Sequence, residues 1–332
     1  MKKFIVVFLA FILLLSMASC NKGGQDEFDI VKAKEIVLGK EVDSVVIETS
    51  EGEEITCDKT ADFYEIFDKI GFVNYKAGKK LSCVAETKLG DESKSYVNMN
   101  AYYLDSAELY EFRAKKEGDD AVLVVEEYNY SKKLEDNSFE MSSFSKYTYK
   151  DEKALNGSES GANGVVRYSS KEYPIFPTNG TELCEMQARA VYLRNLISQS
   201  TFFKNYEPYE LNDKTYDINE FVTREYKLYE NYIVFKQTAP FFNIPSGVNK
   251  DFSLLYASIS NSDCSITQEA YYNLKTGEVE LVKLYGATSW HTVEYYGRKI
   301  EINLLLYIHK GDEAEYNQKV DALKNYVKSN AN

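Results

Sequence analysis

Short runs rich in β-branched and aromatic residues recur along most of this chain, and they constrain its fold more than any other feature. Runs of this composition between turn residues are typical of β-strands. They predict seven strands before residue 150, at 42–47, 54–57, 81–88, 96–104, 109–114, 122–130 and 139–149. They also predict two later hairpins, which pair 266–274 with 279–285 and 292–296 with 299–308. We therefore expect a chain dominated by antiparallel sheet.

Three other segments carry apolar residues at helical spacing. The first is 63–70, and the other two begin where Asn179 with Glu182, and Asp312 with Glu315, resemble helix-capping pairs. The predicted inward-facing residues are Phe63, Ile66, Phe67 and Ile70 in the first helix, Leu183, Met186, Ala190, Leu193 and Ile197 in the second, and Tyr316, Val320, Leu323 and Val327 in the third. Strands outnumber helices without a regular βαβ alternation, so the predicted class is α+β, with mainly antiparallel sheets and a few packing helices.

The clearest interruption of these patterns is the Gly-, Ser- and Asn-rich segment 156–164. Such a composition is typical of either a domain linker or a long hairpin loop, and the sequence leaves both open. It separates a predicted N-terminal α+β region, 29–155, from a predicted C-terminal α+β region, 165–332. The second region is expected to hold a helix followed by an antiparallel meander.

The charge and the aromatic content limit the classes of partner. The formal net charge is −13, and no compact cluster of Lys and Arg stands out, so we do not expect the chain to bind nucleic acid. The chain has 28 Tyr against one Trp. Tyrosine combines an apolar ring with a polar tip, which suits strands, interfaces and sugar sites. A protein, a glycan or a lipid therefore all remain possible ligands.

The sequence contains no pattern that identifies catalytic, metal-binding or cofactor-binding residues. It lacks a G-x-S-x-G motif and a Gly-rich phosphate loop. Of its two histidines, His291 is interpreted as solvated or packed, and His309, at the end of an apolar strand, is interpreted as marking where that strand leaves the core. The segment 213–220 spaces its oxygen atoms like a calcium loop, but Ile218 stands where the glycine is needed and Arg224 occupies the twelfth place. We therefore expect no cofactor and favour a protein that is not an enzyme.

Four cysteines lie in the body of the chain, at Cys57, Cys83, Cys184 and Cys264. Four cysteines in an exported domain allow three disulfide pairings, and the spacing here matches no zinc site. Free buried thiols are an equal alternative, so the pairing is left open.

The N-terminus combines Lys2 and Lys3, an apolar stretch at 4–15, and the sequence Met17-Ala18-Ser19-Cys20. This order of charged, apolar and small residues resembles the type II signal peptide of bacterial lipoproteins. The resemblance implies cleavage of the signal 1–19 between Ser19 and Cys20. It also implies a diacylglyceryl anchor on Cys20, carrying fatty-acyl chains such as palmitate, and a polar tether, 20–28. The mature protein would then face the extracytoplasmic side of the cell membrane or outer membrane.

These observations favour a membrane-anchored, non-enzymatic binding or interaction module. A first alternative is a carrier of lipid or another apolar ligand. The predicted helix 179–200 with the strands after it is similar to periplasmic lipoprotein carriers over 165–308, and 272–277 is similar to their strand-end turn. That resemblance implies a hollow sheet. A second alternative is an envelope glycan or peptide hydrolase, which would show a cleft with convergent acids.

Overall fold

The fold is known from a computed structural model that describes residues 36–48, 52–70, 78–104, 106–161, 164–170, 208–211, 213–239, 265–289 and 299–331. Strands hold 62% of these residues, and the same residues contain only two α-helices. The protein is therefore mostly β, and the predicted α+β class was wrong. The segment 156–164, expected to be a linker or a hairpin loop, lies in strands at its described residues, with 156–161 in one strand and Gly164 at the start of the next. The predicted helix 179–200 lies outside the described residues.

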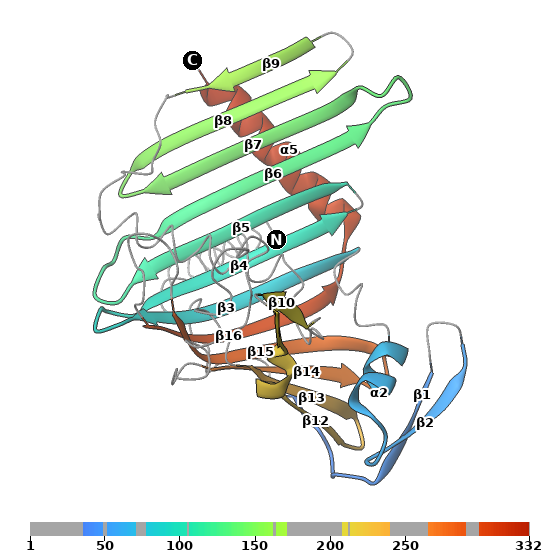
Figure 1. The fold of residues 1–332 in the computed structure, drawn as a ribbon. Coiled ribbons are helices and arrows are strands. Elements are labelled where there is room, and N and C mark those ends of the chain that lie inside the picture. Colours follow the sequence, from blue (N-terminus) through green and yellow to red (C-terminus); the bar gives the residue numbers. More distant parts are fainter. Residues whose placement is uncertain are drawn as a thin grey trace, which may run out of the picture.

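A single antiparallel sheet of 12 strands forms the body of the molecule, in the order β12-β13-β14-β15-β16-β3-β4-β5-β6-β7-β8-β9 (Figure 1). Its early strands are β3 (Lys79–Leu89), β4 (Ser95–Leu104), β5 (Ala107–Lys116), β6 (Leu123–Lys133), β7 (Phe139–Tyr149), β8 (Glu152–Gly161) and β9 (Gly164–Ser169). Its late strands are β12 (Thr223–Leu228), β13 (Tyr232–Ala239), β14 (Ile266–Asn273), β15 (Glu278–Ser289) and β16 (Lys299–Lys310).

The pairing of β16 with β3 joins the two ends of the chain into this sheet. Leu304 lies opposite Ala85, in a ladder of antiparallel partners that extends from Ile300 and Leu89 to Lys310 and Lys79. The sheet thus contains strands from both predicted regions, 29–155 and 165–332. Their division at 156–164 stays a prediction about domains; in the structure that segment belongs to the β8–β9 pair.

Within the described residues, the smaller elements are two hairpins and three helical segments. The hairpins are β1 (Ser44–Glu48) with β2 (Glu54–Asp58), and β10 (Tyr209–Leu211) with β11 (Lys214–Tyr216). The helices are α2 (Phe63–Lys69), the 3-10 helix η4 (Ile218–Phe221) and α5 (Glu313–Asn330). The predictions of the β1–β2 hairpin, of α2 and of α5 are confirmed. So is the predicted hairpin of 266–274 with 279–285, which forms β14 and β15.

Apolar and polar side chains alternate along the strands, and this gives the sheet one apolar and one polar face. In β3, Leu81, Cys83 and Ala85 are at most 1% exposed, whereas the intervening Lys80 and Ser82 lie on the other face and are only half-buried. Side chains alternate between the faces of a strand, so this pattern fixes which residues enter the core. We call these surfaces the apolar face and the polar face.

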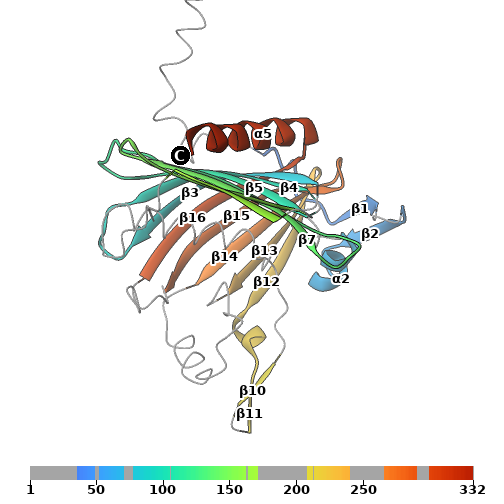
Figure 2. The same ribbon diagram turned by 90° about the horizontal axis from the view of Figure 1, so that it is seen from above.

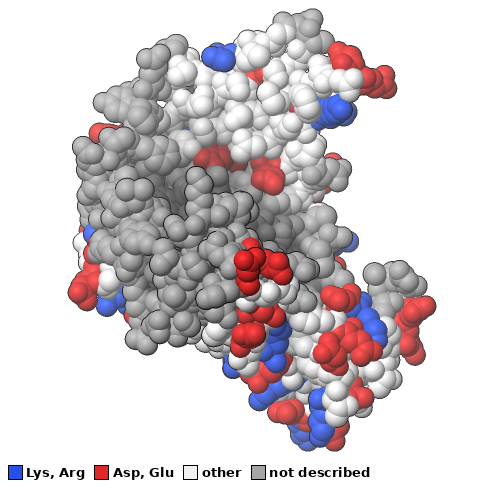
Figure 3. Space-filling model, viewed as in Figure 1, with Lys and Arg blue, Asp and Glu red and all other residues white. Residues whose placement is uncertain are grey.

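The β1–β2 hairpin and α2 cover the apolar face over the late strands. The rings of Phe63 and Phe67 pack edge-on against Phe235 of β13, with ring centroids 5.6 and 5.4 Å apart. The Tyr226 hydroxyl of β12 donates to the backbone oxygens of Asp58 and Ala61, at 2.6 and 2.8 Å. These contacts hold α2 on this face. Seen from that side, acidic and basic side chains mingle around β1, β2 and α2 (Figure 3).

The helix α5 covers the opposite, polar face over the early strands (Figure 2). Its Val327 and Leu323 are buried with Tyr128 and Phe144 of the sheet. Gly157 of β8 makes this close packing possible: a Cβ there would lie 2.8 Å from Cδ1 of Phe144 and 2.9 Å from Cγ1 of Val327. A glycine is therefore required by space and not by its backbone angles.

Several sequence predictions fall partly or wholly on residues that the structure does not describe. The signal 1–19, Cys20 with the tether 20–28, and the first arm of the hairpin 292–296 lie outside the described residues. The second arm of that hairpin is β16. Cys57 and Cys83 are buried free thiols, whereas Cys184 and Cys264 lie outside the described part. No helix in the described part combines the length and the apolar character needed to cross a bilayer.

Candidate binding clefts on the polar face

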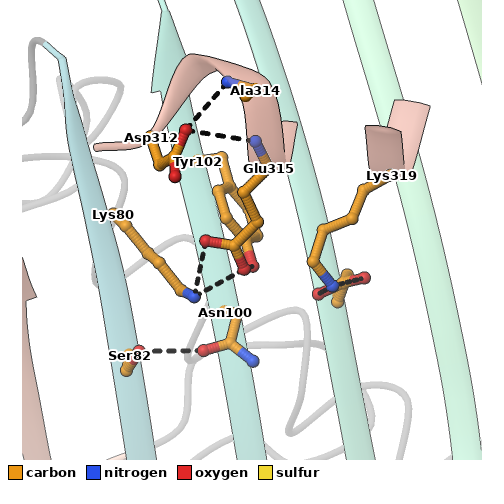
Figure 4. Close-up of polar contacts among 9 residues, drawn as sticks. Lys80, Ser82, Asn100, Tyr102, Asp312, Ala314, Glu315 and Lys319 are labelled. Carbon is orange, nitrogen blue, oxygen red and sulfur yellow. Dashed lines mark hydrogen bonds and ion pairs between the residues drawn. The ribbon is translucent and has the colours of Figure 1, made fainter. Parts of the chain in front are cut away.

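A group of polar contacts fixes the start of α5 on the sheet (Figure 4). The Asp312 carboxylate caps the helix by accepting from the backbone nitrogens of Ala314 and Glu315, at 2.9 and 3.3 Å. Glu315 Oε1 in turn accepts from Lys80 Nζ at 2.8 Å and from the Tyr102 hydroxyl at 3.0 Å. The hydrogen bond from Lys80 is the main reason that the pKa of Glu315 lies below its ordinary value. These residues position α5.

One turn further along α5, Lys319 contacts the sheet at the edge of a cleft. Its Nζ donates to both oxygens of Glu111, at 2.7 and 2.8 Å. The cleft beside this pair has a volume of about 310 Å³ and lies between α5 and strands β4–β7. Its polar lining is Asn98, Asn100, Glu111, Arg113, Glu126, Lys146 and Lys319. We call it the α5 cleft.

Neighbouring side chains hold the lining of the α5 cleft in place. Lys146 Nζ lies 2.5 Å from Glu126 Oε2 and 4.6 Å from the centre of the Tyr326 ring. Ser82 Oγ donates to Asn100 Oδ1 at 2.9 Å, and the amide nitrogen of Asn100 points away from Ser82 (Figure 4). A hydrogen-bonded lining of this kind is ordered before any ligand arrives, which lowers the entropic cost of binding.

A second cleft, of about 540 Å³, lies on the same face over the late strands. The segment 36–40 forms one wall of this cleft. Backbone hydrogen bonds hold it against the start of β13: the oxygens of Leu38 and Lys40 accept from the nitrogens of Asn231 and Glu230, at 3.1 and 2.9 Å. The opposite wall is the end of β16, with Tyr307 and His309. We call it the Tyr307 cleft.

A three-residue hydrogen-bond network lies in the Tyr307 cleft. The Tyr232 hydroxyl donates to Glu280 Oε2 at 2.9 Å, and Asn273 Nδ2 donates to Glu280 Oε1 at 2.8 Å and to the Tyr232 hydroxyl at 3.2 Å. Burial raises the pKa of Tyr232, and the hydrogen bond to Glu280 adds to this, because both favour the neutral phenol. Tyr232 is thus a hydrogen-bond donor that keeps its proton.

Two rings stand beside this network. Those of Tyr307 and His309 have centroids 6.3 Å apart and planes 16° from parallel. They are two residues apart on β16 and therefore share a face. His309 is exposed and next to last in its strand, which confirms the prediction that it marks where the strand leaves the core. His291 lies outside the described residues.

Tyrosine hydroxyls donate to carboxylates throughout the described structure, which connects the high Tyr content with the acidic charge. The pairs are Tyr102–Glu315, Tyr110–Glu108, Tyr147–Glu127, Tyr149–Asp119, Tyr232–Glu280, Tyr271–Glu269 and Tyr285–Glu269. In each pair a neutral phenol supplies a donor to a carboxylate, and two of these carboxylates also pair with a lysine, Glu315 with Lys80 and Asp119 with Lys150. Burial and the bond to Glu269 raise the pKa of Tyr285 to about 12. Most of these tyrosines are therefore structural.

In the segment 213–220, which resembles a calcium loop, side-chain oxygens accept hydrogen bonds from groups of the protein. Asp217 caps η4 by accepting from the Asn219 nitrogen at 2.8 Å, and Asn219 Oδ1 accepts from Arg224 Nη2 at 2.9 Å. In the described ranges, no group of three or more His, Cys, Asp or Glu residues is placed to hold a metal ion. The sequence identified neither cleft, because their residues come from distant strands and carry no motif.

Comparison with known proteins adds little to this description. No protein-family model matches the chain, and no curated protein matches its sequence. Among solved structures, it is similar to a β-barrel-like protein of a domain of unknown function, DUF1849, from Brucella abortus. That match has 11% sequence identity and a TM-score of 0.25, and it covers 70% of this chain and 99% of the other.

Proposed function

We propose that this protein is a lipid-anchored, extracytoplasmic binding module that takes a glycan in the Tyr307 cleft. The observation that carries the proposal is the combination in that cleft of a half-buried ring, Tyr307, and an exposed ring, His309, with a hydrogen-bonded amide and carboxylate. The volume of about 540 Å³ lies within the range of small-molecule sites. The cleft is therefore suited to a ligand that is apolar on its ring faces and polar at its rim.

Sugars have this mixed character. The apolar face of a sugar ring packs on an aromatic ring, such as that of Tyr307 or His309, while its hydroxyls bond to amides and carboxylates. Asn273 and Glu280 supply these groups and are already held by Tyr232. In the described lining, Lys275 and Lys310 balance Glu278 and Glu280, so a neutral glycan meets no net charge.

The same geometry favours binding over hydrolysis. A glycosidase needs a carboxyl group that can donate a proton to the leaving oxygen, together with a second carboxylate. Both oxygens of Glu280 accept hydrogen bonds, and Glu278 forms an ion pair with Lys79. Each carboxylate is engaged as an acceptor, which suits a fixed recognition group.

The carrier alternative requires a hollow among apolar side chains. On the apolar face, Leu81, Ala85, Leu304 and Leu306 are 0% exposed, so the centre of the sheet is packed around them. Native mass spectrometry of the full chain provides the test. Stoichiometric co-purified lipid would favour the carrier, whereas a lipid-free mass apart from the covalent anchor would favour the module.

The anchor is a separate part of the proposal and rests on the sequence around Cys20. Labelling of growing cells with radioactive palmitate should mark the wild-type protein and place it in the membrane fraction. The Cys20→Ala variant should lose the label, and the Cys57→Ala variant should keep it. A labelled Cys20→Ala protein would contradict the anchor.

Glycan binding is tested by screening the full chain on an array of neutral bacterial and host glycans, followed by calorimetry with the strongest one. We expect Tyr307→Ala to weaken binding at least about 10-fold, since a buried aromatic contact contributes more than 1 kcal/mol. Tyr285→Ala is the matched control, because Tyr285 is exposed on the same face in the adjacent strand and outside the cleft. An array without any bound glycan, or equal losses in both variants, would contradict the proposal.

A further inference from the structure

The hydrogen-bond network of the Tyr307 cleft already uses the hydrogens of its own amide and phenol. Asn273 Oδ1 accepts from the backbone nitrogens of Lys275 and Thr276, at 2.8 and 3.3 Å, which fixes the orientation of the amide. Its Nδ2 then donates to Glu280 and to the Tyr232 hydroxyl. The Tyr232 hydrogen is itself directed at Glu280. The network therefore offers an arriving ligand acceptors and not donors.

Glu280 supplies these acceptors. Its Oε1 accepts from Asn273 at 2.8 Å and its Oε2 accepts from Tyr232 at 2.9 Å, and both donors belong to neutral groups. An ionised carboxylate has about four lone-pair positions, two on each oxygen. One position on each oxygen is therefore left after the network has formed. Glu280 is a half-buried residue of β15 in the lining of the cleft, so a ligand in the cleft reaches it.

The charges of the cleft favour neutral donors at Glu280. Glu278, the other carboxylate of the described lining, forms an ion pair with Lys79. Lys275 and Lys310 line the same cleft and oppose the entry of a cation. The donors that suit Glu280 are therefore hydroxyls and not an ammonium group. Two hydroxyls can each reach one oxygen of the same carboxylate when they stand on adjacent carbons, because their oxygens then lie close together.

We propose that Glu280 selects glycans with two adjacent free hydroxyls, each of which donates to one of its oxygens. This inference rests on the proposed function and names the part of the glycan that the Tyr307 cleft recognises. Tyr232 and Asn273 are positioning residues, because their hydrogen bonds orient the carboxylate before the ligand arrives. A glycan that lacks one of the two hydroxyls leaves a charged acceptor unsatisfied, and a site of this kind discriminates against it.

The first test measures calorimetric binding of methyl α-D-glucopyranoside, methyl α-D-mannopyranoside and methyl α-D-galactopyranoside to the full chain. Their hydroxyls at carbons 2, 3 and 4 form adjacent pairs of different configuration. The 2-, 3- and 4-deoxy forms of the tightest binder are measured next. We expect at least two deoxy forms, at adjacent carbons, to bind at least about 10-fold more weakly than the parent.

Three results would overturn the inference. One is that none of the three parent glycosides binds. Another is a loss of affinity at a single carbon, at carbons 2 and 4 only, or at none. The third is that the 2-amino form of the glucoside binds more tightly than the glucoside itself, because Glu280 would then recognise a cation.

Variants assign the selection to Glu280. Glu280→Gln replaces one acceptor oxygen by an NH₂ group, so the parent glycoside should bind at least about 10-fold more weakly, and the deoxy form at one sensitive carbon should bind nearly as well as the parent. Glu269→Gln is the matched control, because Glu269 also accepts one phenol hydrogen on each oxygen, from Tyr271 and Tyr285, and lies outside the cleft lining. An unchanged deoxy pattern in Glu280→Gln that is folded by circular dichroism would overturn the assignment.

Tyr232→Phe provides a second variant, which keeps the ring and removes one of the two bonds that hold Glu280. It should reduce the ratio of parent to deoxy affinity, because the carboxylate is less well oriented. Tyr271→Phe, which loses the same kind of bond to Glu269, is its control and should keep the ratio. The same reduction in both variants would contradict the positioning role of Tyr232.

The inference and the proposed function fail separately. Tyr307→Ala removes the ring on which the sugar packs, so it should weaken the parent glycoside and its deoxy forms by the same factor. A glycan whose binding depends on Tyr307 and not on Glu280 would support the proposed function and overturn this inference. An array without any bound glycan contradicts the proposed function itself.

Discussion

The early and late halves of the sheet are covered on opposite faces, and this difference accounts for the two clefts. Over β4–β9, α5 packs on the polar face, and ion pairs such as Lys319–Glu111 mix with buried rings. Over β12–β14, α2 packs on the apolar face through Phe235. The Tyr307 cleft is open on the polar face of that half. The α5 helix brings Lys319 to a mainly charged cleft, whereas no described helix covers the Tyr307 cleft, where rings and an amide lie among the charged groups.

The largest expected effect concerns the apolar packing of the late half. Phe235→Ala removes a ring that is 0% exposed and that contacts Phe63 and Phe67. We expect a loss of about 3–5 kcal/mol in the free energy of unfolding, as for other buried phenylalanines. Chemical denaturation measures it. Phe139→Ala, at a residue that is 53% exposed, is the control and should change stability by less than about 0.5 kcal/mol. Similar losses in both would show that the core of this half is not where we place it.

A smaller effect is expected where α5 meets the early half. Gly157→Val forces a side chain into Phe144 and Val327, and overpacking of this kind costs about 1–3 kcal/mol. Amide hydrogen exchange should accelerate in α5 and not in α2. The control is Gly161→Val in the same strand, where a Cβ meets nothing within 4 Å. Uniformly faster exchange in both helices would mean that the two halves do not respond separately.

The smallest effect is a pH dependence confined to α5. The pKa of Glu315 is lowered in the folded state, mainly by the hydrogen bond from Lys80. Its stabilising contribution is therefore present above the unfolded pKa of about 4.3 and is lost as the pH falls through the lower folded value. The pair is partly exposed, so solvent limits the effect to below about 1 kcal/mol.

This pH dependence is measured as hydrogen exchange in α5 between pH 6 and pH 3. Wild-type α5 should be less protected at the acidic end, whereas Glu315→Gln should lose most of that difference. Glu313→Gln is the control in the same helical turn. An unchanged pH profile in Glu315→Gln would remove Glu315 from the docking of α5.

The sequence predicted local elements well where side-chain type and spacing act together. The apolar positions Tyr316, Val320, Leu323 and Val327 are the buried residues of α5, and Asp312 is its cap, as expected. The prediction of a linker or loop was wrong for 156–161, because its Gly and Asn residues have low strand propensity. Pairing with β7 and β9 nevertheless makes it a strand, and Gly157 is needed there for close packing. This error contributed to the wrong α+β class.

The clefts could not be predicted for a different reason. Lys80 and Glu315 are separated by 235 positions in the chain, and Lys319 and Glu111 by 208. A polar residue in an alternating strand is expected on a solvated face whether or not a helix later covers it. The exposed ring of His309 was located correctly, but its partner Tyr307 and the Glu280 network were not foreseen.

The sequence by itself determined which residues share a face of each strand and helix, because periods of 2.0 and 3.6 residues follow from backbone geometry. It also predicts the anchor at Cys20, which stays a prediction. Only the tertiary structure decided that β16 pairs with β3 and that α2 and α5 pack on opposite faces. Those choices depend on contacts between residues far apart in the chain, whose closure entropy is recovered only when the whole sheet buries its apolar face.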